Sequence, residues 1–336
     1  MTHAKVKKKQ VEEKQDQKPL ARVLVTGGAG FIGSHVVDLL LADPKVTRVV
    51  VVDSFTLNYD PKRKVENTRL HKNDARYRLV RADITDAERI ENLFKKEQFD
   101  TVLHLAASCD ARKAVLEPKL YLETNVMGTF NLFESGVRHG VHHFVLASTS
   151  SVYGNDTTAP YRESEKADRA LTMYGASKKA MEQLAFTYYH NHGVQVTCLR
   201  IFNAYGERMR EDLVLPKWVQ SITRGESIKL SGAGTRIRDF TYVKDVARAF
   251  LLASRIPGFH VVNVGSAKPV SLKKLLGVVE KVLGKKAEIV PYASHHGSVE
   301  MTHADTKLAK KLLMFTTAMP LEEGVRAYVS WLTGKR

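Results

Sequence analysis

The chain has 336 residues, of which 43% are hydrophobic and 26% are charged, and its formal net charge at pH 7 is +16. This composition is typical of a globular protein with a sizeable core, and no apolar run approaches the ~20 residues of a membrane span. The basic residues are scattered rather than arranged in a stripe with interleaved aromatic residues, so we expect no binding to nucleic acid or to membranes. The two cysteines, Cys109 and Cys198, provide neither a disulfide framework nor a metal-ligand cluster, and we predict no metal site.

Residues 1–20 are predicted to be a disordered basic tail. They are polar, rich in lysine and without a hydrophobic period. They also lack the apolar core of a secretory signal peptide, so we expect the protein in the cytoplasm.

Between residues 21 and 205, short apolar runs alternate with helical patterns. Runs that are continuously apolar are typical of strands buried on both faces of a parallel sheet, with helices as crossovers. The pattern predicts a Rossmann-type, doubly wound α/β fold. We expect strands at 22–26, 48–52, 77–81, 101–105, 142–148 and 196–201, and helices at about 31–42, 86–96, 118–138 and 171–192.

The rhythm changes after Tyr205. Residues 206–336 are expected to form mainly a smaller α/β lobe that packs against the carboxyl ends of the sheet, where ligands bind in such folds. We predict helices at about 214–224, 244–256, 271–283 and 321–333, and short strands at 228–230, 260–263 and 287–291.

The stretch from Leu24 to His35, LVTGGAGFIGSH, predicts a buried strand, a tight turn and a helix. Glycine in such a turn tolerates positive φ and lets the backbone approach both a ligand and the helix closely. The N–H groups at the start of the helix can then bind a pyrophosphate. Two glycine registers fit, one with Gly28, Gly30 and Gly33 and one with Gly27, Gly30 and Gly33. We expect a dinucleotide cofactor to contact Gly27, Gly30, Phe31, Ile32 and Gly33.

Asp53 follows the apolar run 49–52 and lies 20 residues after Gly33. A carboxylate in this place can accept hydrogen bonds from both ribose hydroxyls of an adenosine and repels a 2′-phosphate, which favours NAD over NADP. Lys62, Arg63 and Lys64 follow shortly afterwards and could bind a phosphate, so NADP is an alternative.

The next two strand ends extend the predicted cofactor site. Asp83 and Ile84 could flank an adenine ring, although Asp83 or Thr85 could equally cap a helix. Small residues at the following strand end leave room for a flat cofactor, and we include Leu105, Ala106 and Ala107 in the site.

A third group of residues carries candidate catalytic functions. Tyr174 and Lys178 are four residues apart, which places them on one helix face, and a cation near a phenol favours the phenolate. Tyr174 could therefore act as a base, although such pairs also occur by chance on helices. Thr149 supplies a hydroxyl at the end of a predicted strand, in a serine-rich stretch of a kind that usually forms only a turn. The order of the glycine turn, Asp53, Thr149 and the Tyr-Lys pair is more informative than any single motif.

From about Arg22 to the C-terminus the sequence resembles the extended short-chain dehydrogenases/reductases, in particular the NAD-dependent sugar-nucleotide epimerase/dehydratase family. The resemblance implies NAD as cofactor, with Asn125 among its contacts, and a UDP-sugar as substrate. It also implies a homodimer formed through helices at 118–138 and 171–192. The motifs that carry it are TGGAGFIG at 26–33, HLAA at 104–107, TNVMGT at 124–129, SVYG at 151–154, RIFNAYG at 200–206 and RDFTYV at 238–243, together with Asp53, Asp83, Ile84, Tyr174 and Lys178.

The resemblance also assigns parts of a substrate site. Asn203 and Arg238 match the positions that hold the diphosphate, and Leu215 matches one beside the nucleobase. Arginine suits diphosphate binding because its planar, permanently charged fork matches phosphate oxygens. A surface pair between Arg238 and Asp239 is the alternative. On this assignment, residues 21–205 mainly bind NAD and carry the catalytic residues, and residues 206–336 mainly bind the nucleotide sugar.

The resemblance further implies how the reaction begins. Tyr174 would take the proton of the sugar 4-hydroxyl while C4 passes a hydride to the nicotinamide, giving a 4-keto sugar. Thr149 would hydrogen-bond that oxygen, and Lys178 would hold the nicotinamide ribose and keep the phenol acidic. The dehydratases of the family carry an Asp-Glu pair after the threonine, where this chain has Ser150 and Ser151. The simplest outcome is therefore 4-epimerisation. A dehydratase with other acid/base groups and a non-catalytic dinucleotide-binding protein are the alternatives.

The sugar is inferred from a few positions. The sequence most resembles the UDP-glucuronate 4-epimerases, with a small residue, Thr302, at a pocket-wall position and with Arg210 available to pair with a carboxylate. Arg210 could instead be a solvated loop charge. Asn203 replaces the threonine that is usual in these enzymes, and Ser298 replaces an aspartate. Epimerisation of a UDP-N-acetylhexosamine or a UDP-hexose is the alternative.

Overall fold

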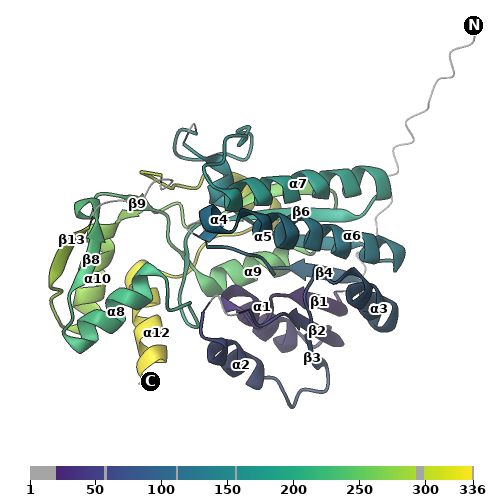
Figure 1. The fold of residues 1–336 in the computed structure, drawn as a ribbon, viewed down its shortest axis with the longest axis horizontal. Coiled ribbons are helices and arrows are strands. Elements are labelled where there is room, and N and C mark those ends of the chain that lie inside the picture. The colour runs from purple at the N-terminus through teal and green to yellow at the C-terminus, as the bar shows by residue number, and fades with distance from the viewer. Residues whose placement is uncertain (1–19, 57–58, 111–112, 156, 293–298, 335–336) are drawn as a thin grey trace, which may run out of the picture.

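The computed structural model describes residues 20–56, 59–110, 113–155, 157–292 and 299–334. At its centre lies a sheet whose neighbouring strands all run parallel, and it contains all six strands predicted between residues 21 and 205 (Figure 1). The order of the strands reverses between β1 and β4, which opens a ligand crevice at their carboxyl ends. In spatial order the strands are β11 (Phe259–Val264), β6 (Gln195–Ile201), β5 (His143–Thr149), β4 (Thr101–His104), β1 (Arg22–Thr26), β2 (Arg48–Asp53) and β3 (Tyr77–Arg81).

Helices cover both faces of this sheet and bury its apolar strands in two separate cores. One face packs against α1 (Phe31–Ala42), α9 (Val243–Ala253) and α11 (Lys307–Leu313). The other packs against α3 (Ala87–Glu97), α6 (Gly128–Arg138) and α7 (Met173–His192). The predicted doubly wound α/β fold is therefore confirmed, and the continuously apolar strands are buried for the reason expected.

The single helix predicted at 118–138 is divided into three parts. It begins as α5 (Pro118–Leu122), passes through a π-helical turn η1 (Glu123–Met127) and continues as α6. The short α4 (Lys113–Leu116) precedes it. A π-helical turn inserts an extra residue into the helix, and Asn125 at its middle is completely buried. Periodicity alone could not reveal this local change of pitch.

Two elements expected among those of the second lobe, a strand and a helix, belong to the main sheet and its covering layer. The strand predicted at 260–263 is β11, which pairs in parallel with β6 at one edge of the sheet. Parallel strands need a crossover, and α9 supplies it by packing against α1. The chain therefore returns to the central sheet after it has entered the second lobe.

The second lobe lies beside the sheet and has its own core, with Trp218, Leu275 and Tyr328 among its buried residues (Figure 1). Its main elements are α8 (Val214–Arg224), β8 (Ile228–Ser231), α10 (Leu272–Leu283), β13 (Ile289–Tyr292) and α12 (Leu321–Thr333), with β8 and β13 paired in parallel. Two-stranded pairs join the lobe to the sheet, β7 (Ala204–Tyr205) with β10 (Thr241–Tyr242) and β9 (Ile237–Arg238) with β12 (Val270–Ser271).

The sequence patterns did not predict α2 (Pro61–Arg69). This helix is strongly polar, so it shows almost no hydrophobic period. Its start is nevertheless encoded locally, because Asp60 accepts a hydrogen bond from the Lys62 N–H at 2.9 Å and Pro61 occupies the first helical position.

Candidate active site

A cavity of about 970 Å³ lies at the carboxyl ends of the strands and is closed on its far side by the second lobe. Its volume is at the upper end of the range for small-molecule sites, as two ligands bound together would require. Every residue predicted to bind cofactor or substrate lines it except Asn125. These residues are Gly27, Gly30, Phe31, Ile32, Gly33, Asp53, Asp83, Ile84, Leu105, Ala106, Ala107, Thr149, Tyr174, Lys178, Asn203, Arg210, Leu215, Arg238 and Thr302.

The glycine turn connects β1 to α1 and selects one of the two predicted registers. Gly27 has a φ of 70°, and a Cβ on it would lie 2.7 Å from the Ala106 nitrogen. A Cβ on Gly33 would overlap the carbonyl oxygen of Gly27, whereas Gly28 faces the side chain of Val51 in the core. The register whose three glycines all line the cavity is therefore the one with Gly27, Gly30 and Gly33. No side chain caps α1 at Gly30, so its first N–H groups are available to an anion.

Asp53 ends β2 and is almost completely buried. Its Oδ1 accepts hydrogen bonds from the Phe55 N–H and from the Lys64 ammonium, both at 2.9 Å. Arg63 forms an ion pair with Glu211 at 2.8 Å. Two of the three basic residues considered as ligands for an NADP phosphate are thus paired with carboxylates of the chain.

Asp83 and Ile84 lie at the cavity, where β3 ends, as predicted. The alternative that Asp83 or Thr85 caps the next helix is wrong, because Asp86 caps α3 and accepts a hydrogen bond from the Arg89 N–H at 3.0 Å. Asp83 instead accepts hydrogen bonds from the backbone and hydroxyl of Thr85.

Asn125 does not line the cavity but lies behind its wall. Its amide accepts a hydrogen bond from the Ser108 N–H at 2.8 Å, and it donates to the Ser108 carbonyl and to the Ser177 hydroxyl, each at 2.9 Å. Ser177 in turn donates to the carbonyl of Tyr174. Asn125 therefore ties the loop after β4 to helix α7, and a direct cofactor contact is not what this geometry provides.

Thr149, Tyr174 and Lys178 meet at the carboxyl end of β5. Tyr174 and Lys178 lie one turn apart on α7, which starts with Thr172 as N-cap, its hydroxyl accepting from the Gly175 N–H at 3.2 Å. The Thr149 hydroxyl donates to the Ser151 hydroxyl at 3.2 Å and lies close enough to the Tyr174 phenol to lower its pKa. The three residues that the sequence placed in a common site are thus brought together by a sheet edge and one helix face.

Burial dominates the electrostatics of this group. It raises the pKa of the Tyr174 phenol, as does the nearby Cys109 thiol, while the Thr149 hydroxyl acts in the opposite direction. Burial also lowers the pKa of Lys178 to about 8. The lowering of the phenol pKa expected from Lys178 is therefore outweighed by loss of water. Among the described residues, the one hydrogen-bond partner of the Lys178 ammonium is the Met181 sulfur at 3.8 Å.

At the Tyr174 end of the cavity, the described residues that line it include no carboxylate. Among the lining residues that the structure describes, the carboxylates are Asp53 and Asp83, which follow β2 and β3. Thr149 ends β5, three strands away from β2, which corresponds to ~14 Å. Ser150 and Ser151 occupy the cavity wall beside Thr149. This end of the site offers hydroxyl groups where an acid/base pair would be needed for loss of water.

Two arginines face the cavity from the second lobe. Arg238 donates to the carbonyls of Val299 and Ile237, at 2.8 and 2.7 Å, so its guanidinium is held in place. The alternative pair with Asp239 does not form, because Asp239 is fully buried and accepts hydrogen bonds from Ser266 and Ala304. Arg236 also lines the cavity, and its charge lowers the pKa of Arg238 in addition to the effect of burial.

Arg210 is not a solvated loop charge. It is mostly buried, with 13% of its side chain exposed, and donates to the Asp212 carboxylate at 3.0 Å and to the Cys109 sulfur at 2.7 Å. On the opposite side of the cavity Thr302 donates to Asn203 at 3.1 Å. Ser298 lies outside the described residues, so the structure does not bear on its expected position.

Some lining residues were not predicted from the sequence, among them Tyr59, Arg236 and Phe240. Arg236 stands two residues before Arg238, and the doubled arginine was a detectable signal of an anion site. Tyr59 and Phe240 give no such signal, because the sequence alone does not distinguish an aromatic residue that lines a cavity from one that packs in the core.

No group of three or more potential metal ligands occurs in the described part of the chain. None of the helices in that part is long and apolar enough to cross a membrane.

The sequence matches a model of the NAD dependent epimerase/dehydratase family over residues 23–265. The chain belongs to this family. Among curated proteins it is 35% identical to the UDP-glucuronate 4-epimerase of Thermodesulfobacterium geofontis over 309 residues, which cover 92% of this chain and 95% of that protein.

Solved structures with the same fold bind different sugars. The UDP-glucuronic acid 4-epimerase of Bacillus cereus, in complex with UDP-glucuronic acid and NAD, aligns with a TM-score of 0.87 and 30% identity, covering 93% of this chain and 99% of that one. The UDP-glucose 4-epimerase of Thermotoga maritima, with UDP-glucose, aligns with a TM-score of 0.86 and 31% identity over the same shares. The family and fold are thus shown, and the fold alone does not distinguish the sugars.

The cavity fits NAD on its own geometry. The uncapped start of α1 and the close approach of Gly27 to Ala106 form a cradle for a pyrophosphate that a Cβ would fill. The buried Lys178 ammonium has only a sulfur as partner in the described chain, so ribose hydroxyls would satisfy it.

Proposed function

We propose that the protein is an NAD-dependent UDP-sugar 4-epimerase and that its substrate is UDP-glucuronate. The observation that carries the proposal is the cavity wall at the end of β5, where Thr149, Tyr174 and Lys178 meet without a carboxylate beside them. This arrangement supports one proton transfer at a sugar hydroxyl and offers no second acid/base pair for loss of water.

In this proposal Tyr174 takes the proton of the sugar 4-hydroxyl and later returns it. Thr149, whose hydroxyl lies near the Tyr174 phenol, would donate a hydrogen bond to the sugar oxygen as charge builds up on it. Lys178 holds the cofactor ribose and adds a positive charge close to the phenol. When bound, the nicotinamide supplies the hydride chemistry at C4 and a positive charge that favours the phenolate. Inversion at C4 would require the 4-keto sugar to turn within the cavity, so that its opposite face meets the hydride donor.

The second lobe would hold the UDP portion. Arg236 and Arg238 face the cavity together, as two planar donors suited to a diphosphate, and Leu215 offers an apolar surface to a base. Asn203 and Thr302 lie next to each other on the wall and would contact the diphosphate and the sugar.

Arg210 favours a carboxylated sugar. Its guanidinium faces the cavity near Tyr174, and it influences the Tyr174 pKa. Although it is paired with Asp212, its planar guanidinium lines the cavity and suits an anionic substituent at C6. The similarity to UDP-glucuronate 4-epimerases supports the same sugar. The small Thr302 keeps a UDP-N-acetylhexosamine as the second candidate.

A panel of UDP-sugars tests this proposal directly. The purified protein should convert UDP-glucuronate to its C4 epimer without added reductant and without change of mass. Conversion of UDP-N-acetylglucosamine with UDP-glucuronate unchanged would show that the sugar is wrong, and a product lighter by one water would indicate a dehydratase.

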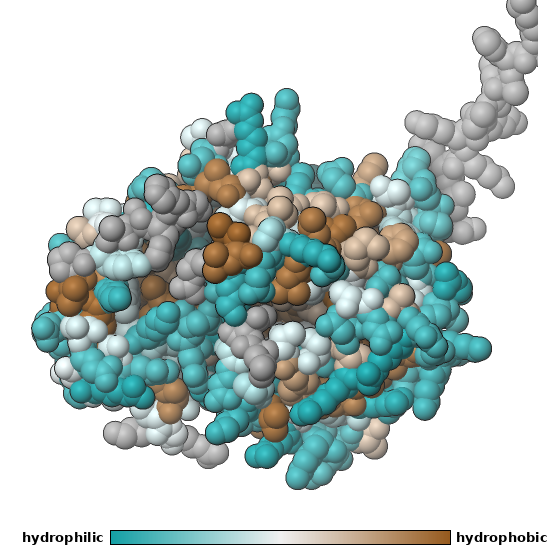
Figure 2. Space-filling model, viewed as in Figure 1, coloured by the Kyte–Doolittle hydropathy of each residue, from teal (hydrophilic) through white to brown (hydrophobic). Residues whose placement is uncertain are grey.

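We also propose that the enzyme is a homodimer in the cytoplasm. Large apolar side chains are exposed along α4, α5, η1, α6 and α7, and Figure 2 shows brown side chains gathered on the face where Figure 1 places α4, α5 and α6. Packing α6 and α7 against a second copy would cover them. The two unpaired cysteines are compatible with a reducing compartment. The exposed apolar side chains that a second copy would cover include Leu116, Leu122, Met127, Phe130 and Phe186.

A charged substitution at Met127, which is 51% exposed, tests the dimer. We expect Met127→Asp to shift the protein from dimer to monomer in analytical ultracentrifugation. A parent protein that sediments as a monomer at micromolar concentration would contradict the proposal.

A further inference from the structure

The segment 206–211 crosses between the cofactor-binding half and the second lobe. Met209 and Arg210 line the cavity, so the course of this segment decides where the Arg210 guanidinium lies. Arg208 has a φ of 62°, in the left-handed region that residues other than glycine rarely adopt. A backbone of this kind persists only where the surrounding contacts determine it.

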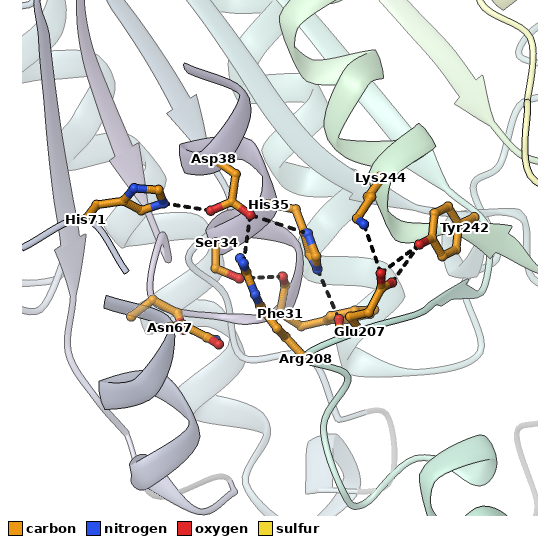
Figure 3. A network of polar contacts seen from close by, with 11 residues as sticks. Phe31, Ser34, His35, Asp38, Asn67, His71, Glu207, Arg208, Tyr242 and Lys244 are labelled. Carbon is orange, nitrogen blue, oxygen red and sulfur yellow. Dashed lines mark hydrogen bonds and ion pairs between the residues drawn. The ribbon is translucent and has the colours of Figure 1, made fainter. Parts of the chain in front are cut away.

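Asp38 of α1 holds one side of the segment (Figure 3). Its carboxylate forms an ion pair with Arg208 at 2.8 Å and accepts a hydrogen bond from His71 at 2.7 Å. Burial alone would raise the pKa of Asp38, but the hydrogen bonds from His71 and Arg208 outweigh it and hold that pKa below its usual value. Asp38 is therefore ionised at neutral pH and available to the guanidinium.

The neighbouring residue, Glu207, is fixed from α1 again and from two further elements, β10 and α9 (Figure 3). Burial lowers the pKa of His35 to about 4, so its ring is neutral, and its Nε2–H donates to the Glu207 carbonyl at 3.0 Å. The Glu207 carboxylate accepts hydrogen bonds from Tyr242 at 2.7 Å and from Lys244 at 2.9 Å. These contacts immobilise the backbone just before Arg208.

Helix α2 holds the other side of the segment. Arg63 forms an ion pair with Glu211 at 2.8 Å and also lies over the ring of Trp331 at 4.8 Å from its centroid. On the same helix, Lys64 pairs with Asp53 and the Asn67 amide donates to the Ala29 carbonyl in the glycine turn at 2.9 Å. The helix that holds Glu211 is thus itself fixed to the cofactor wall.

We propose that Asp38 and Arg63 are positioning residues that clamp the segment on both sides of Arg210 and thereby hold its guanidinium toward the C6 carboxylate of the substrate. The clamp needs both ion pairs, because Arg208 and Glu211 flank Arg210 in the chain. This inference rests on the proposed function, in which Arg210 contacts that carboxylate.

The test compares two ligands that differ only at C6, UDP-glucuronate with a carboxylate and UDP-glucose with a hydroxymethyl group. Their dissociation constants for the NAD-loaded protein are measured by calorimetry for Asp38→Asn, Arg63→Gln and the double variant. Each single variant should bind UDP-glucuronate about 3- to 10-fold more weakly, while UDP-glucose binding stays within about twofold and kcat is retained. Asp74→Asn is the matched control, because Asp74 pairs with Arg76 at 2.8 Å in a turn outside the cavity wall.

Unchanged affinity for UDP-glucuronate, or an equal loss for both ligands, would overturn the clamp. The variant Arg210→Met distinguishes a failure of the clamp proposal from a failure of the role proposed for Arg210. If this variant binds both ligands like the parent, the assigned role of Arg210 is wrong. If it discriminates less between them, Asp38→Asn should add no further loss in the Arg210→Met background, and an additive loss would show that Asp38 does not act through Arg210.

Discussion

The two walls of the cavity are built in different ways. The cofactor wall consists largely of backbone and strand ends, the glycine turn after β1 and the ends of β2, β3 and β4, which are adjacent in the sheet. The proposed substrate wall consists of side chains from segments far apart in the sequence, the long Arg210, Arg236 and Arg238 and the small Thr302.

Because of this difference, the structural requirements for binding the cofactor are distinct from those for choosing the sugar. A backbone turn accepts the part of a ligand that many enzymes share, and a Cβ in the wrong place abolishes it. A wall of side chains can be changed one residue at a time, so related folds accept UDP-glucose or UDP-glucuronic acid. Thr149, Tyr174 and Lys178, the proposed catalytic residues, lie where the walls meet.

The largest effect is expected at this junction. Tyr174→Phe removes the group that accepts the proton and should lower kcat by roughly 10³-fold, while both walls keep their ligands. Stopped-flow or discontinuous product assays together with binding of NAD and UDP-glucuronate would check this. Tyr188→Phe is a matched control on the same helix, since the Tyr188 hydroxyl bonds Glu134 instead of lining the cavity. Full turnover by Tyr174→Phe would disprove the catalytic assignment.

A substitution at Gly33 in the cofactor wall should abolish most of the NAD binding. A Cβ there overlaps the carbonyl oxygen of Gly27, so Gly33→Ala must displace the turn, and the purified protein should retain little NAD. Bound NAD is measured by its absorbance after denaturation. Gly277→Ala is the control, because no atom lies within 4 Å of its added Cβ and the change in a helix should stabilise the fold by about 0.5–1 kcal/mol. Normal NAD content in Gly33→Ala would contradict this account of the turn.

A substitution at Arg238 in the substrate wall should weaken sugar-nucleotide binding without affecting NAD binding. Arg238→Met removes one of two cavity-facing guanidinium groups and should weaken UDP-glucuronate binding by about 10- to 100-fold, with the NAD content unchanged. Calorimetry on the NAD-loaded variant measures the effect. A parallel loss of NAD would show that the two walls are not independent.

A smaller effect is expected from pH. Lys178 has a pKa of about 8 because it is buried, and ribose oxygens of bound NAD would raise that pKa by stabilising the ammonium. Binding then takes up a proton above pH 8, so NAD affinity should be constant below pH 8 and fall by up to about tenfold per pH unit above it. Titrations of the NAD-free protein between pH 7 and 9.5 would reveal this slope. A flat profile would mean that Lys178 does not contact the cofactor.

The cofactor wall was largely predictable from the sequence because its determinants are local. The strand-turn-helix around Gly27 and the carboxylate of Asp53 are encoded within a few residues, and both line the cavity as expected. The place of Asn125 was not predictable in the same way, because it lies in a π-helical turn that hydrophobic periodicity does not reveal, and its amide bonds Ser108 behind the wall.

The substrate wall was less predictable because its geometry depends on distant contacts. The proposed clamp consists of Asp38 on α1, which pairs with Arg208, and Arg63 on α2, which pairs with Glu211. Helix α2 is strongly polar, so no hydrophobic pattern predicts it. Arg210 could be interpreted from the sequence only as a carboxylate ligand or a solvated charge, and its burial between Asp212 and Cys109 is a property of the folded chain.

In the proposed epimerisation, a hydride leaves C4 of the sugar and returns to the same carbon. The most direct measurement uses UDP-glucuronate carrying deuterium at C4, incubated with the protein in ordinary water and followed by NMR and mass spectrometry. We predict a C4 epimer of unchanged mass that retains the deuterium at C4. Loss of the deuterium to solvent, or a product of different mass, would contradict the proposed epimerisation.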